Sequence, residues 1–395
     1  MSRRTRTVDV LVVGAGPAGR AAAARLAAAG AGTVEVLERA PSRGLKEPGG
    51  AVLRAGVTAT GWAGPRTLDT TGPGGLERIT ARAVVLATGA RERPRAARLV
   101  PGTRAAGVLT AGELLRTVYA YGGGHGIGTR AVLVGPDEPI ARQAVRALRR
   151  AGVEVAALVT EEPRDRPAVC GPGYGRVLVL GETAVTELLG RGRLSGVRLR
   201  HRDGRTATVA CDTVVFGGDW IPEHELARYG GLVLDPGTRG PAVDGAFRTS
   251  EAGVFAAGDV LHAVEGPGRA AAEGRAVATA VLAYLAGRAP WPERPVPVVV
   301  DAPLRWVTPN RIGGPDDGGF LLRAREHLVR PVVSVRQDGR VLYRRRLWRV
   351  ATPSRSVVLP GGWTDRVDPD GGPVRISAAP PPGRRGRGRR SAWPG

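Results

Sequence analysis

The stretch of residues 8–39 decides the fold of this chain. It reads VDVLVV at 8–13, GAGPAG at 14–19, RAAAARLAAA at 20–29 and TVEVLER at 33–39. The β-branched apolar run predicts a buried strand, and the alanine-rich run predicts a helix that Gly30 and Gly32 end. A second strand is expected at 33–37. This order of strand, glycine turn, helix and strand is that of a βαβ unit.

The spacing of the glycines in this unit predicts a dinucleotide site. Gly14 allows a tight turn, Gly16 lets the backbone come close to a pyrophosphate, and Gly19 lets the helix pack closely on the strand. The free N–H groups at the start of the helix favour phosphate. Glu38 lies 19 positions beyond Gly19, at a strand end, where a carboxylate can accept hydrogen bonds from the hydroxyls of an adenosine ribose. We therefore expect a nucleotide-binding α/β domain.

Length and composition bound the class of protein. The chain has 395 residues, enough for two or three domains, and 42% hydrophobic residues, which is typical of a soluble globular protein. No apolar run approaches the length of a membrane span, and Asp9 with the following glycine turn leaves no apolar core for an export signal. We expect a cytoplasmic protein without a membrane partner.

The cysteines and the basic residues exclude several functions. Cys170 and Cys211 are the only cysteines, so the chain has no Cys-x-x-Cys redox pair and no four-cysteine metal site, and we expect no metal. The net charge is +22, but Lys46 is the only lysine among 58 basic residues, and the arginines are spread along the chain. This pattern indicates a general attraction to anions, and a nucleic-acid partner is not expected.

A second βαβ unit is predicted between residues 129 and 218. Strands are expected at 131–134 and 153–160, with a helix at 140–151 between them. The turn after the first strand keeps only the first glycine, Gly135, and Asp137 stands where a pyrophosphate needs a residue without a side chain. This unit is expected to fold like a nucleotide-binding domain, and its use of NAD(P) stays open.

Two further strands are expected to bring bare backbone to a ligand. The strand at 83–87 runs into Thr88-Gly89, and the strand at 253–257 runs into Gly258-Asp259. A helix is expected at 269–285, directly after the second of them.

The remaining segments are expected to be short strands and a tail. Antiparallel strands are predicted at 57–62, 66–70 and 76–80. Residues 296–377 alternate strands and turns without a helix, with a hairpin turn at Asp338-Gly339, and predict a small β-sandwich. The tail 379–395, rich in Arg, Pro and Gly, is expected to be disordered.

Three motifs in this order resemble the FAD-binding half of the pyridine nucleotide-disulfide oxidoreductase superfamily. They are 14–19 with Glu38, ATG at 87–89, and GVFAAGD at 253–259. The second βαβ unit stands between the last two, as the NAD(P) domain of that superfamily does. Within it, ATGARERP at 87–94 followed by GVLT at 107–110 resembles the branch of opine oxidase, hydrogen cyanide synthase and heterotetrameric sarcosine oxidase subunits. Those enzymes take hydride from an amine carbon to flavin.

The resemblance implies a domain order. It implies an α/β FAD-binding Rossmann-like domain with an inserted NAD(P)-binding-like domain, followed by a small all-β domain. The FAD-binding domain is expected at 1–128 and 219–290, the inserted domain at 129–218, the β-sandwich-like domain at 296–378 and the disordered Arg-rich tail at 379–395.

The resemblance also implies which residues hold FAD. The 14–19 turn would hold the pyrophosphate, Glu38 the ribose, and Asp259 the ribityl chain, while the helix that starts near 266–269 would aim its positive end at the flavin. The expected cofactor-binding residues are Gly14, Ala15, Gly16, Pro17, Ala18, Gly19, Glu38, Arg39, Thr88, Gly89, Gly258 and Asp259. The implied substrate is a small amine, amino acid or similar metabolite, and no catalytic residue is assigned.

Departures from the family pattern keep alternatives open. The interval between Glu38 and Ala87 is short, and 51–56 reads as the end of a flavin-facing helix that is otherwise missing. The leading hypothesis is an FAD-dependent oxidoreductase that is not a disulfide reductase. The second is a non-catalytic or degenerate flavoprotein subunit that keeps the fold for assembly, with a partner oxidoreductase subunit. A third, a nucleic-acid-binding accessory protein, rests on the net charge and on the arginines of 384–390.

Several polar side chains near the predicted site have open roles. His262 follows the Asp259 motif and could approach the flavin ring, and His224 begins a short helix, but a surface or capping role is favoured for both. Glu265 and Arg269 either bind substrate or flank a helix start. The two cysteines are expected to pack as small apolar groups.

Overall fold

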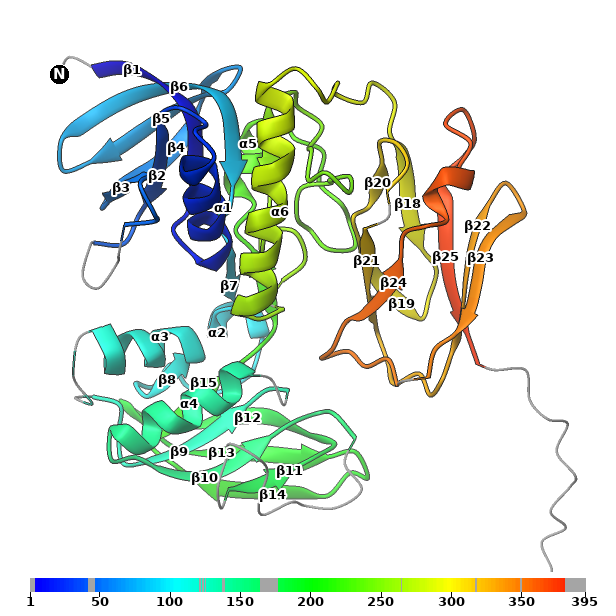
Figure 1. Cartoon of the computed structure of the whole chain (residues 1–395). Helices are drawn as coiled ribbons and strands as arrows, with labels where there is room; N and C mark the ends of the chain where they lie inside the picture. The colour runs from blue at the N-terminus through cyan, green and yellow to red at the C-terminus, as the bar shows by residue number, and fades with distance from the viewer. Residues whose placement is uncertain are drawn as a thin grey trace, which may run out of the picture. The chain divides into compact units, whose positions relative to one another are not determined.

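The structure, a computed structural model, divides into two compact units. One is formed by Met1–Gly89 with Pro222–Gly395, and the other by Ala90–Ile221. Figure 1 labels most of the helices and strands of both. The structure describes residues 4–41, 47–120, 122, 124, 126–136, 139–163, 177–263, 265–316, 318–348 and 350–380. The finer division expected at residues 128, 218, 290 and 378 stays a prediction.

A mainly parallel sheet carries the first unit. Its strand order is β3-β2-β1-β6-β5-β4, and β17 pairs with β6. β1 pairs in parallel with β2 and with β6, as the predicted βαβ crossover requires. The strands are β1 (Arg4–Val13), β2 (Val34–Glu38), β3 (Val52–Ala55), β4 (Thr58–Gly64), β5 (Thr67–Gly72), β6 (Gly75–Leu86) and β17 (Val254–Ala256). The helices are α1 (Pro17–Ala28), α5 (Glu225–Tyr229) and α6 (Pro267–Leu285).

The two faces of this sheet belong to two different apolar cores. Val10 and Val12 of β1 share one core with α1 and α6, whereas Leu11 and Val13 share the other with residues of α5. α1 and α6 lie side by side on the sheet (Figure 1). They pack backbone to backbone, because a side chain at Gly274 of α6 would overlap the carbonyl group of Ala18 in α1. Packing therefore fixes the start of α1, where the glycine turn lies.

The segment after β2 corrects two predictions. Residues 51–56, expected to end a helix, contain β3, which pairs in parallel with β2 and satisfies the backbone groups on the outer edge of that strand. The strands expected at 76–80 and 83–87 are one continuous strand, β6. Its length follows from its neighbours, since β1 pairs along most of one edge while β5 and β17 divide the other.

The second unit contains the second βαβ unit. β9, α4 and β10 follow one another as predicted, and β9 pairs in parallel with β10 and β15. The sheet order is β11-β10-β9-β15-β8, a separate antiparallel sheet has the order β12-β13-β14, and β7 pairs with β16. The strands are β7 (Ala90–Glu92), β8 (Val108–Thr110), β9 (Arg130–Val134), β10 (Glu154–Val159), β11 (Leu178–Leu180), β12 (Thr183–Arg191), β13 (Arg193–His201), β14 (Thr206–Ala210), β15 (Thr213–Phe216) and β16 (Trp220–Pro222). The helices are α2 (Arg95–Arg98), α3 (Ala111–Leu115), the π-helical η1 (Arg116–Ala120) and α4 (Pro139–Arg150).

Residues 296–379 of the first unit form two sheets around one shared core. The sheet orders are β20-β18-β25-β22-β23 and β19-β21-β24, and residues of both sheets meet around the buried Trp363. This is the sandwich that the sequence predicts. The strands are β18 (Val296–Val300), β19 (Leu304–Thr308), β20 (Arg311–Ile312), β21 (Gly319–Ala324), β22 (Val332–Gln337), β23 (Arg340–Arg346), β24 (Val357–Pro360) and β25 (Val374–Ala379).

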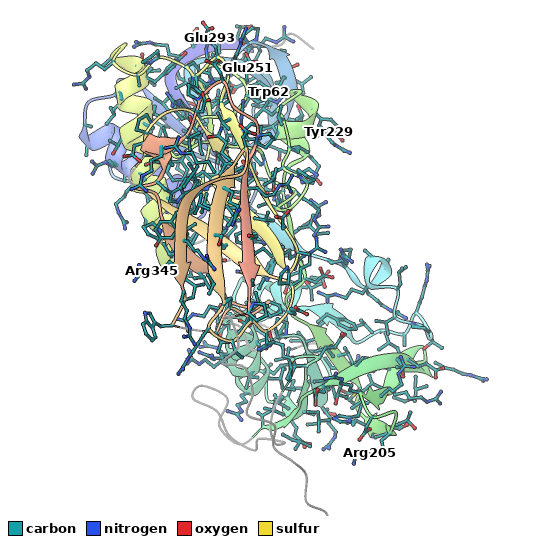
Figure 2. All side chains as sticks on the ribbon, turned by 90° about the vertical axis from the view of Figure 1, so that its right-hand side faces the viewer. Trp62, Arg205, Tyr229, Glu251, Glu293 and Arg345 are labelled. Atoms are coloured by element: carbon teal, nitrogen blue, oxygen red, sulfur yellow. The ribbon has the colours of Figure 1, made fainter. Side chains whose placement is uncertain are left out.

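Details of the sandwich confirm one prediction and correct another. The turn between β22 and β23 is at Asp338 and Gly339, with φ of +47° and +81°, as expected for the predicted hairpin. The region is not free of helix, because residues Thr364–Arg366 form a single 3₁₀ turn, η2, next to the buried Trp363. The arginines of β23 include the exposed Arg345 on this edge strand (Figure 2), as is common for strands that have one unpaired edge.

Three predictions concern residues outside those that the structure describes. These are the repulsive Asp137, the packing of Cys170 and the disorder of 381–395, whereas Ala379 ends β25. None of the helices within the described ranges combines the length and the apolar character that crossing a membrane requires. The mixed α/β class with a small all-β part is the fold class that the sequence predicts.

Candidate functional site

The glycine turn between β1 and α1 has the geometry predicted for two of its three glycines. Gly14 has φ of +108°, and a side chain there would overlap the carbonyl oxygen of Ala87 at the end of β6. A side chain at Gly19 would overlap the carbonyl oxygen of Gly14. Both positions therefore need glycine because protein backbone lies against them.

Gly16 differs from the other two glycines. It is the N-cap of α1 in an ordinary extended conformation, with φ of −67°, and a Cβ atom there would meet no protein atom within 4 Å. No side chain caps α1, and Pro17 occupies its first turn. Unpaired N–H groups at this helix end therefore face space that the protein does not fill, which is the setting in which helices bind phosphate.

A cavity of about 310 Å³ opens at this turn. That volume lies at the lower end of the usual range for small-molecule sites, about 300–1,000 Å³. Its wall combines the ends of β1, β2 and β6 with the start of β4 and of α5. The lining residues are Val13, Gly14, Gly16, Leu37, Glu38, Arg39, Val57, Thr58, Ala59, Ala87, Thr88, Gly89, Glu223, Glu225 and Leu226. Six of the twelve predicted cofactor residues thus line one cavity, and Ala15, Pro17, Ala18 and Gly19 belong to the same turn.

Glu38 holds the end of β2 against the glycine turn. Its Oε2 accepts a hydrogen bond of 2.9 Å from the N–H of Ala15, and its Oε1 accepts one of 2.8 Å from the N–H of Ala40. Each carboxylate oxygen has further lone pairs, so these bonds leave capacity for the hydroxyls of a ligand. The carboxylate therefore fixes the turn and also presents acceptors to the cavity.

Contacts between the segment after β6 and the segment before α5 close the far side of the cavity. Thr88 Oγ1 donates to the carbonyl of Glu223 over 2.7 Å, and the N–H of Glu223 donates to the carbonyl of Gly89 over 2.9 Å. Arg39 Nη2 lies 3.1 Å from Glu223 Oε1, so an ion pair joins β2 to the segment before α5. α5 is itself held to the sheet, because Trp62 Nε1 donates to the carbonyl of Leu226 over 2.7 Å; Figure 2 labels Trp62 of β4 and Tyr229 of α5.

Sequence reasoning missed Glu223 and Glu225 as parts of this site. They flank His224, where a short helix is expected to begin, and more than 180 positions separate them from Glu38. The run Glu223-His224-Glu225 was visible, but nothing in its spacing connects it to the glycine turn.

Gly258 and Asp259 are not among the residues that line the cavity. Gly258 has φ of +82°, and a Cβ there would lie 2.7 Å from Cβ of Ala18, so it packs directly on α1. Its N–H donates to Glu273 Oε2 over 3.0 Å. Burial raises the pKa of Asp259 to about 6, against a smaller opposing contribution from His262.

The structure settles where the other candidate side chains lie. His262 is buried and bonded to Glu273, so the favoured surface or capping role is wrong for it; it stands on a tight turn that packs inward. His224 is at the N-cap position of α5, where its side chain makes no capping hydrogen bond. Glu265 pairs with Arg323, while Arg269 is exposed in the first turn of α6. Cys211 is buried in an apolar core, as predicted, and burial raises the pKa of its thiol to about 11.

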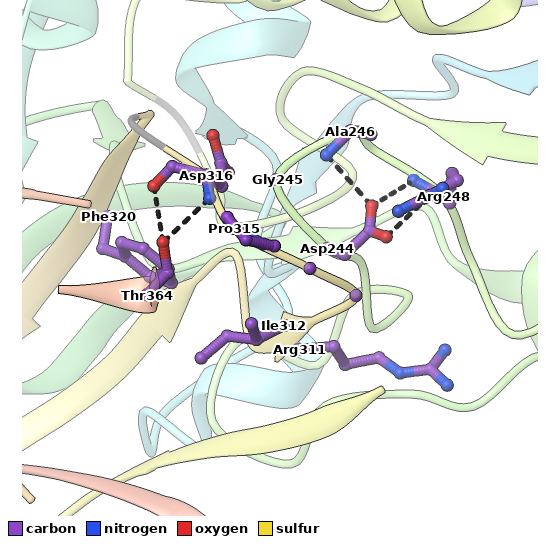
Figure 3. A pocket seen from close by; sticks show the side chains of 12 residues that line it. Asp244, Gly245, Ala246, Arg248, Arg311, Ile312, Pro315, Asp316, Phe320 and Thr364 are labelled. Carbon is purple, nitrogen blue, oxygen red and sulfur yellow. Dashed lines mark hydrogen bonds and ion pairs between the residues drawn. The ribbon is translucent and has the colours of Figure 1, made fainter. Parts of the chain in front are cut away.

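Two further cavities lie elsewhere. One of about 150 Å³ is lined by residues 244–246, Arg248 and residues 311–316 with Phe320 and Thr364 (Figure 3). Asp244 in its wall is already engaged, accepting from the backbone of Ala246 and Arg248 and pairing with the Arg248 guanidinium at 2.7 Å. Within the described parts of the chain, no group of three or more His, Cys, Asp or Glu side chains is arranged to hold a metal.

The other cavity, of about 640 Å³, lies in the second unit. It includes Glu161, which follows the returning strand β10, together with Arg200 and His201 of β13. This cavity lies at the carboxyl end of a strand of the second βαβ unit, which is where nucleotides bind in such units.

Comparison with known proteins gives relatives that share part of this chain. The alpha chain of sarcosine oxidase from Rhizobium meliloti (strain 1021) is 31% identical over 156 residues, which are 40% of this chain and 15% of that protein. An opine oxidase subunit of Agrobacterium tumefaciens (strain Ach5) is 28% identical over 345 residues, 70% of this chain and 66% of that protein. The chain therefore spans less than two thirds of either relative. No family model matches it.

Solved structures share the fold. Thioredoxin reductase of T. acidophilum superposes with a TM-score of 0.57 at 23% identity, over 72% of this chain and the whole of that one. Taken together, the sequence relatives and the shared fold support the broad FAD-dependent oxidoreductase superfamily for this chain.

Proposed function

We propose that this chain is an FAD-dependent oxidoreductase that moves hydride between a small metabolite, of the amine or amino acid class, and flavin. The observation that carries the proposal is the cavity at the start of α1. Gly16 there has no protein neighbour that would require a glycine, and the helix end beside it has no side-chain cap. A ligand with phosphate groups supplies the missing reason for both features.

The residues present fit a dinucleotide such as FAD. Glu38 has carboxylate lone pairs for ribose hydroxyls, and its bonds to Ala15 and Ala40 hold it in place. Gly14, Gly16 and Gly19 with Ala15, Pro17 and Ala18 would hold the pyrophosphate. When bound, FAD supplies the hydride acceptor, and the protein supplies orientation and electrostatic field.

The remaining predicted residues would complete the binding site. Arg39 and Glu223 pair across the cavity wall, and Thr88-Gly89 lie against the segment before α5. Gly258 packs against α1 and would bring the Asp259 turn to the same ligand. No residue is proposed as a catalytic acid or base.

The substrate class rests on the relatives and on the cysteines. The names of the two sequence relatives, sarcosine oxidase and opine oxidase, favour an amine-type substrate. Thioredoxin reductase shares the fold, but this chain has no Cys-x-x-Cys pair. It therefore lacks the two thiols that would pass electrons from flavin to a disulfide substrate. Both relatives are named as subunits of larger enzymes, and we therefore include a partner oxidoreductase chain in the proposal. The cytoplasmic location stays a prediction.

A second candidate is a flavoprotein subunit that keeps the fold without catalysis. The observation that favours it is the short interval after β2, where β3 stands in place of an expected helix and residues 47–86 of the described chain contain strands and turns alone. Such a chain would keep the nucleotide cavity and lose part of the flavin surroundings.

One experiment separates the two candidates. The purified protein is incubated with FAD, freed of unbound cofactor and examined for visible flavin absorbance, then treated without oxygen with a panel of amines and amino acids and with NADH and NADPH. We expect bound flavin that an amine-type compound bleaches, whereas free FAD with the same compounds stays oxidised. Bound flavin that nothing reduces supports the non-catalytic candidate, and failure to bind FAD contradicts the proposed function. Bleaching by NADH or NADPH would assign a working nicotinamide site to the second unit.

A further inference from the structure

His262 and Glu273 form a buried pair directly behind the Gly258–Asp259 turn. His262 Nε2 lies 3.0 Å from Glu273 Oε1 and 3.2 Å from Oε2, and the His262 side chain is 1% exposed. Glu273 Oε2 also accepts the N–H of Gly258 over 3.0 Å. Glu273 comes from α6, so this one carboxylate ties the helix to the turn and to the histidine.

The hydrogen bonds of His262 require an additional proton in this pair. Nδ1 lies 3.0 Å from the carbonyl oxygen of Ala263, which can only accept, so Nδ1 must carry a hydrogen. In a neutral imidazole Nε2 would then be a lone pair facing the lone pairs of a carboxylate. The observed contact forms only if one proton lies between Nε2 and Glu273, either as imidazolium with carboxylate or as imidazole with carboxylic acid.

The groups around the pair support its proton. Burial alone would lower the pKa of His262, but the negative charges of Glu273, Glu265 and Asp259 outweigh burial and raise that pKa above its ordinary value. Glu265 is itself bonded to Arg323 Nη2 and to the hydroxyl of Ser356 in the β-sandwich, and its N–H donates to Asp259 over 3.4 Å.

The β-sandwich covers the other side of the histidine. The Trp306 ring stacks on the His262 ring with centroids 5.9 Å apart and planes at 23°, and the Arg323 guanidinium lies over Trp306 at 5.2 Å. Trp306 and Arg323 are cross-strand neighbours on β19 and β21, and both are buried. The pair is thus closed off from solvent by the sandwich and by α6.

We propose that His262 and Glu273 are positioning residues for FAD. Their shared proton neutralises a negative charge beside the Gly258–Asp259 turn that would otherwise repel the cofactor's phosphates. With the proton, the pair has no net charge; without it, the pair leaves one buried negative charge on the carboxylate that holds the Gly258 N–H. A dianionic pyrophosphate at the neighbouring helix end is then repelled. This inference rests on the proposed function, because it assumes that the ligand is FAD.

Glu273→Gln offers a close test of the proton. A glutamine amide can donate from Nε2 to the imidazole and accept the Gly258 N–H with Oε1, so it reproduces both hydrogen bonds with no additional proton and no charge. FAD affinity is measured by fluorescence quenching from pH 7 to 9, where Asp259, with a pKa of about 6, is already mostly ionised. Wild-type affinity is expected to fall about ten-fold over this range, the linkage for a pKa that differs by about one unit between free and bound protein. The affinity of Glu273→Gln is expected to stay constant.

A control variant and an independent measurement separate the possible failures. Glu293→Gln makes the same change at an exposed position (Figure 2) and should follow the wild-type profile. A flat wild-type profile, or a Glu273→Gln profile that falls like the wild type, overturns the inference while FAD binding itself stands. If no FAD binds at any pH, the proposed function fails instead. The proton is tested independently by ¹⁵N NMR of labelled histidine in the free protein. Below its pKa, His262 should show both ring nitrogens protonated or a shared proton at Nε2. A neutral Nδ1–H form with an unprotonated Nε2 at pH 6.5 would contradict the shared proton.

Discussion

The two βαβ units of this chain share a topology and differ in the turn that follows their first strand. Gly14 after β1 and Gly135 after β9 both have positive φ, +108° and +152°. Each lies against the carbonyl oxygen at the end of the neighbouring parallel strand, that of Ala87 after β6 in one unit and that of Gly217 after β15 in the other. The first glycine is therefore a requirement of the fold in both units.

The units part after that first glycine. Five positions later the first unit has Gly19, against which the turn backbone packs, while the second has Ile140, which packs into the core below α4. Gly16, the one glycine of the 14–19 turn that no protein atom requires, has its counterpart at Asp137, which lies outside the described residues. What a Cβ atom would touch therefore distinguishes the glycines that the fold needs in these turns from the glycine that is left free for a ligand.

The largest expected effect is shared by the two units. Gly14→Ala and Gly135→Ala should each lower the free energy of unfolding of its unit by about 3 kcal/mol, because both place a side chain at positive φ and against backbone. Urea denaturation followed by circular dichroism measures the loss. An undiminished stability in either variant would mean that the first glycine is not a fold requirement there.

A smaller effect, on the pH dependence of stability, distinguishes the turn Gly258-Asp259 after β17 from the turn Gly218-Asp219 after β15. The pKa of Asp259 is raised to about 6, so the folded protein prefers the protonated acid and loses stability as pH rises from about 4 through 6. Asp259→Asn should remove this loss and gain about 2 kcal/mol over the wild type between pH 4 and pH 8, an order-of-magnitude figure. The matched control is Asp219→Asn in the second unit, whose carboxylate is 34% exposed and paired with Arg93 at 3.1 Å. Equal pH dependence of wild type and Asp259→Asn would contradict the assignment.

The smallest expected effect concerns the glutamates at the ends of the second strands, Glu38 at the end of β2 and Glu161 after β10. Glu38→Gln keeps one acceptor but turns an amide group toward a backbone N–H, so it should cost about 1–2 kcal/mol of stability. Glu161→Gln, at an exposed position after β10, should change stability by less than about 0.5 kcal/mol. Thermal melts of both variants measure the difference, and equal melting temperatures would show that Glu38 does not hold the glycine turn.

Local sequence patterns predicted most of the first unit because the βαβ signals lie close together. β1, the turn and α1 occupy 25 consecutive residues, and periodicity, glycine spacing and helix propensity all agree there. The prediction failed at 51–56, where Val52 to Ala55 pair with β2 as an edge strand. Four residues are too few to show the hydrophobic period of a strand or a helix. Pairing with a strand 17 positions earlier decided their conformation.

Contacts between distant parts of the chain lay beyond the sequence patterns. Glu223 reaches the cavity through bonds to Thr88, Gly89 and Arg39, more than 130 positions away. The sequence favours a surface or capping role for His262, whereas its burial depends on Trp306 from β19. No spacing rule connects these pairs, because each is made by tertiary packing.

The most direct test of the account is an FAD titration of wild type, Gly16→Ala and Gly74→Ala. At both glycines φ is not positive and a Cβ would meet no protein atom within 4 Å, but only Gly16 lines the cavity. Gly16→Ala should weaken FAD binding at least about ten-fold, or 1.4 kcal/mol, while its unfolding free energy changes by less than about 1 kcal/mol. Gly74→Ala should bind like the wild type. FAD binding by Gly16→Ala as tight as that of the wild type would contradict the placement of the cofactor at this turn.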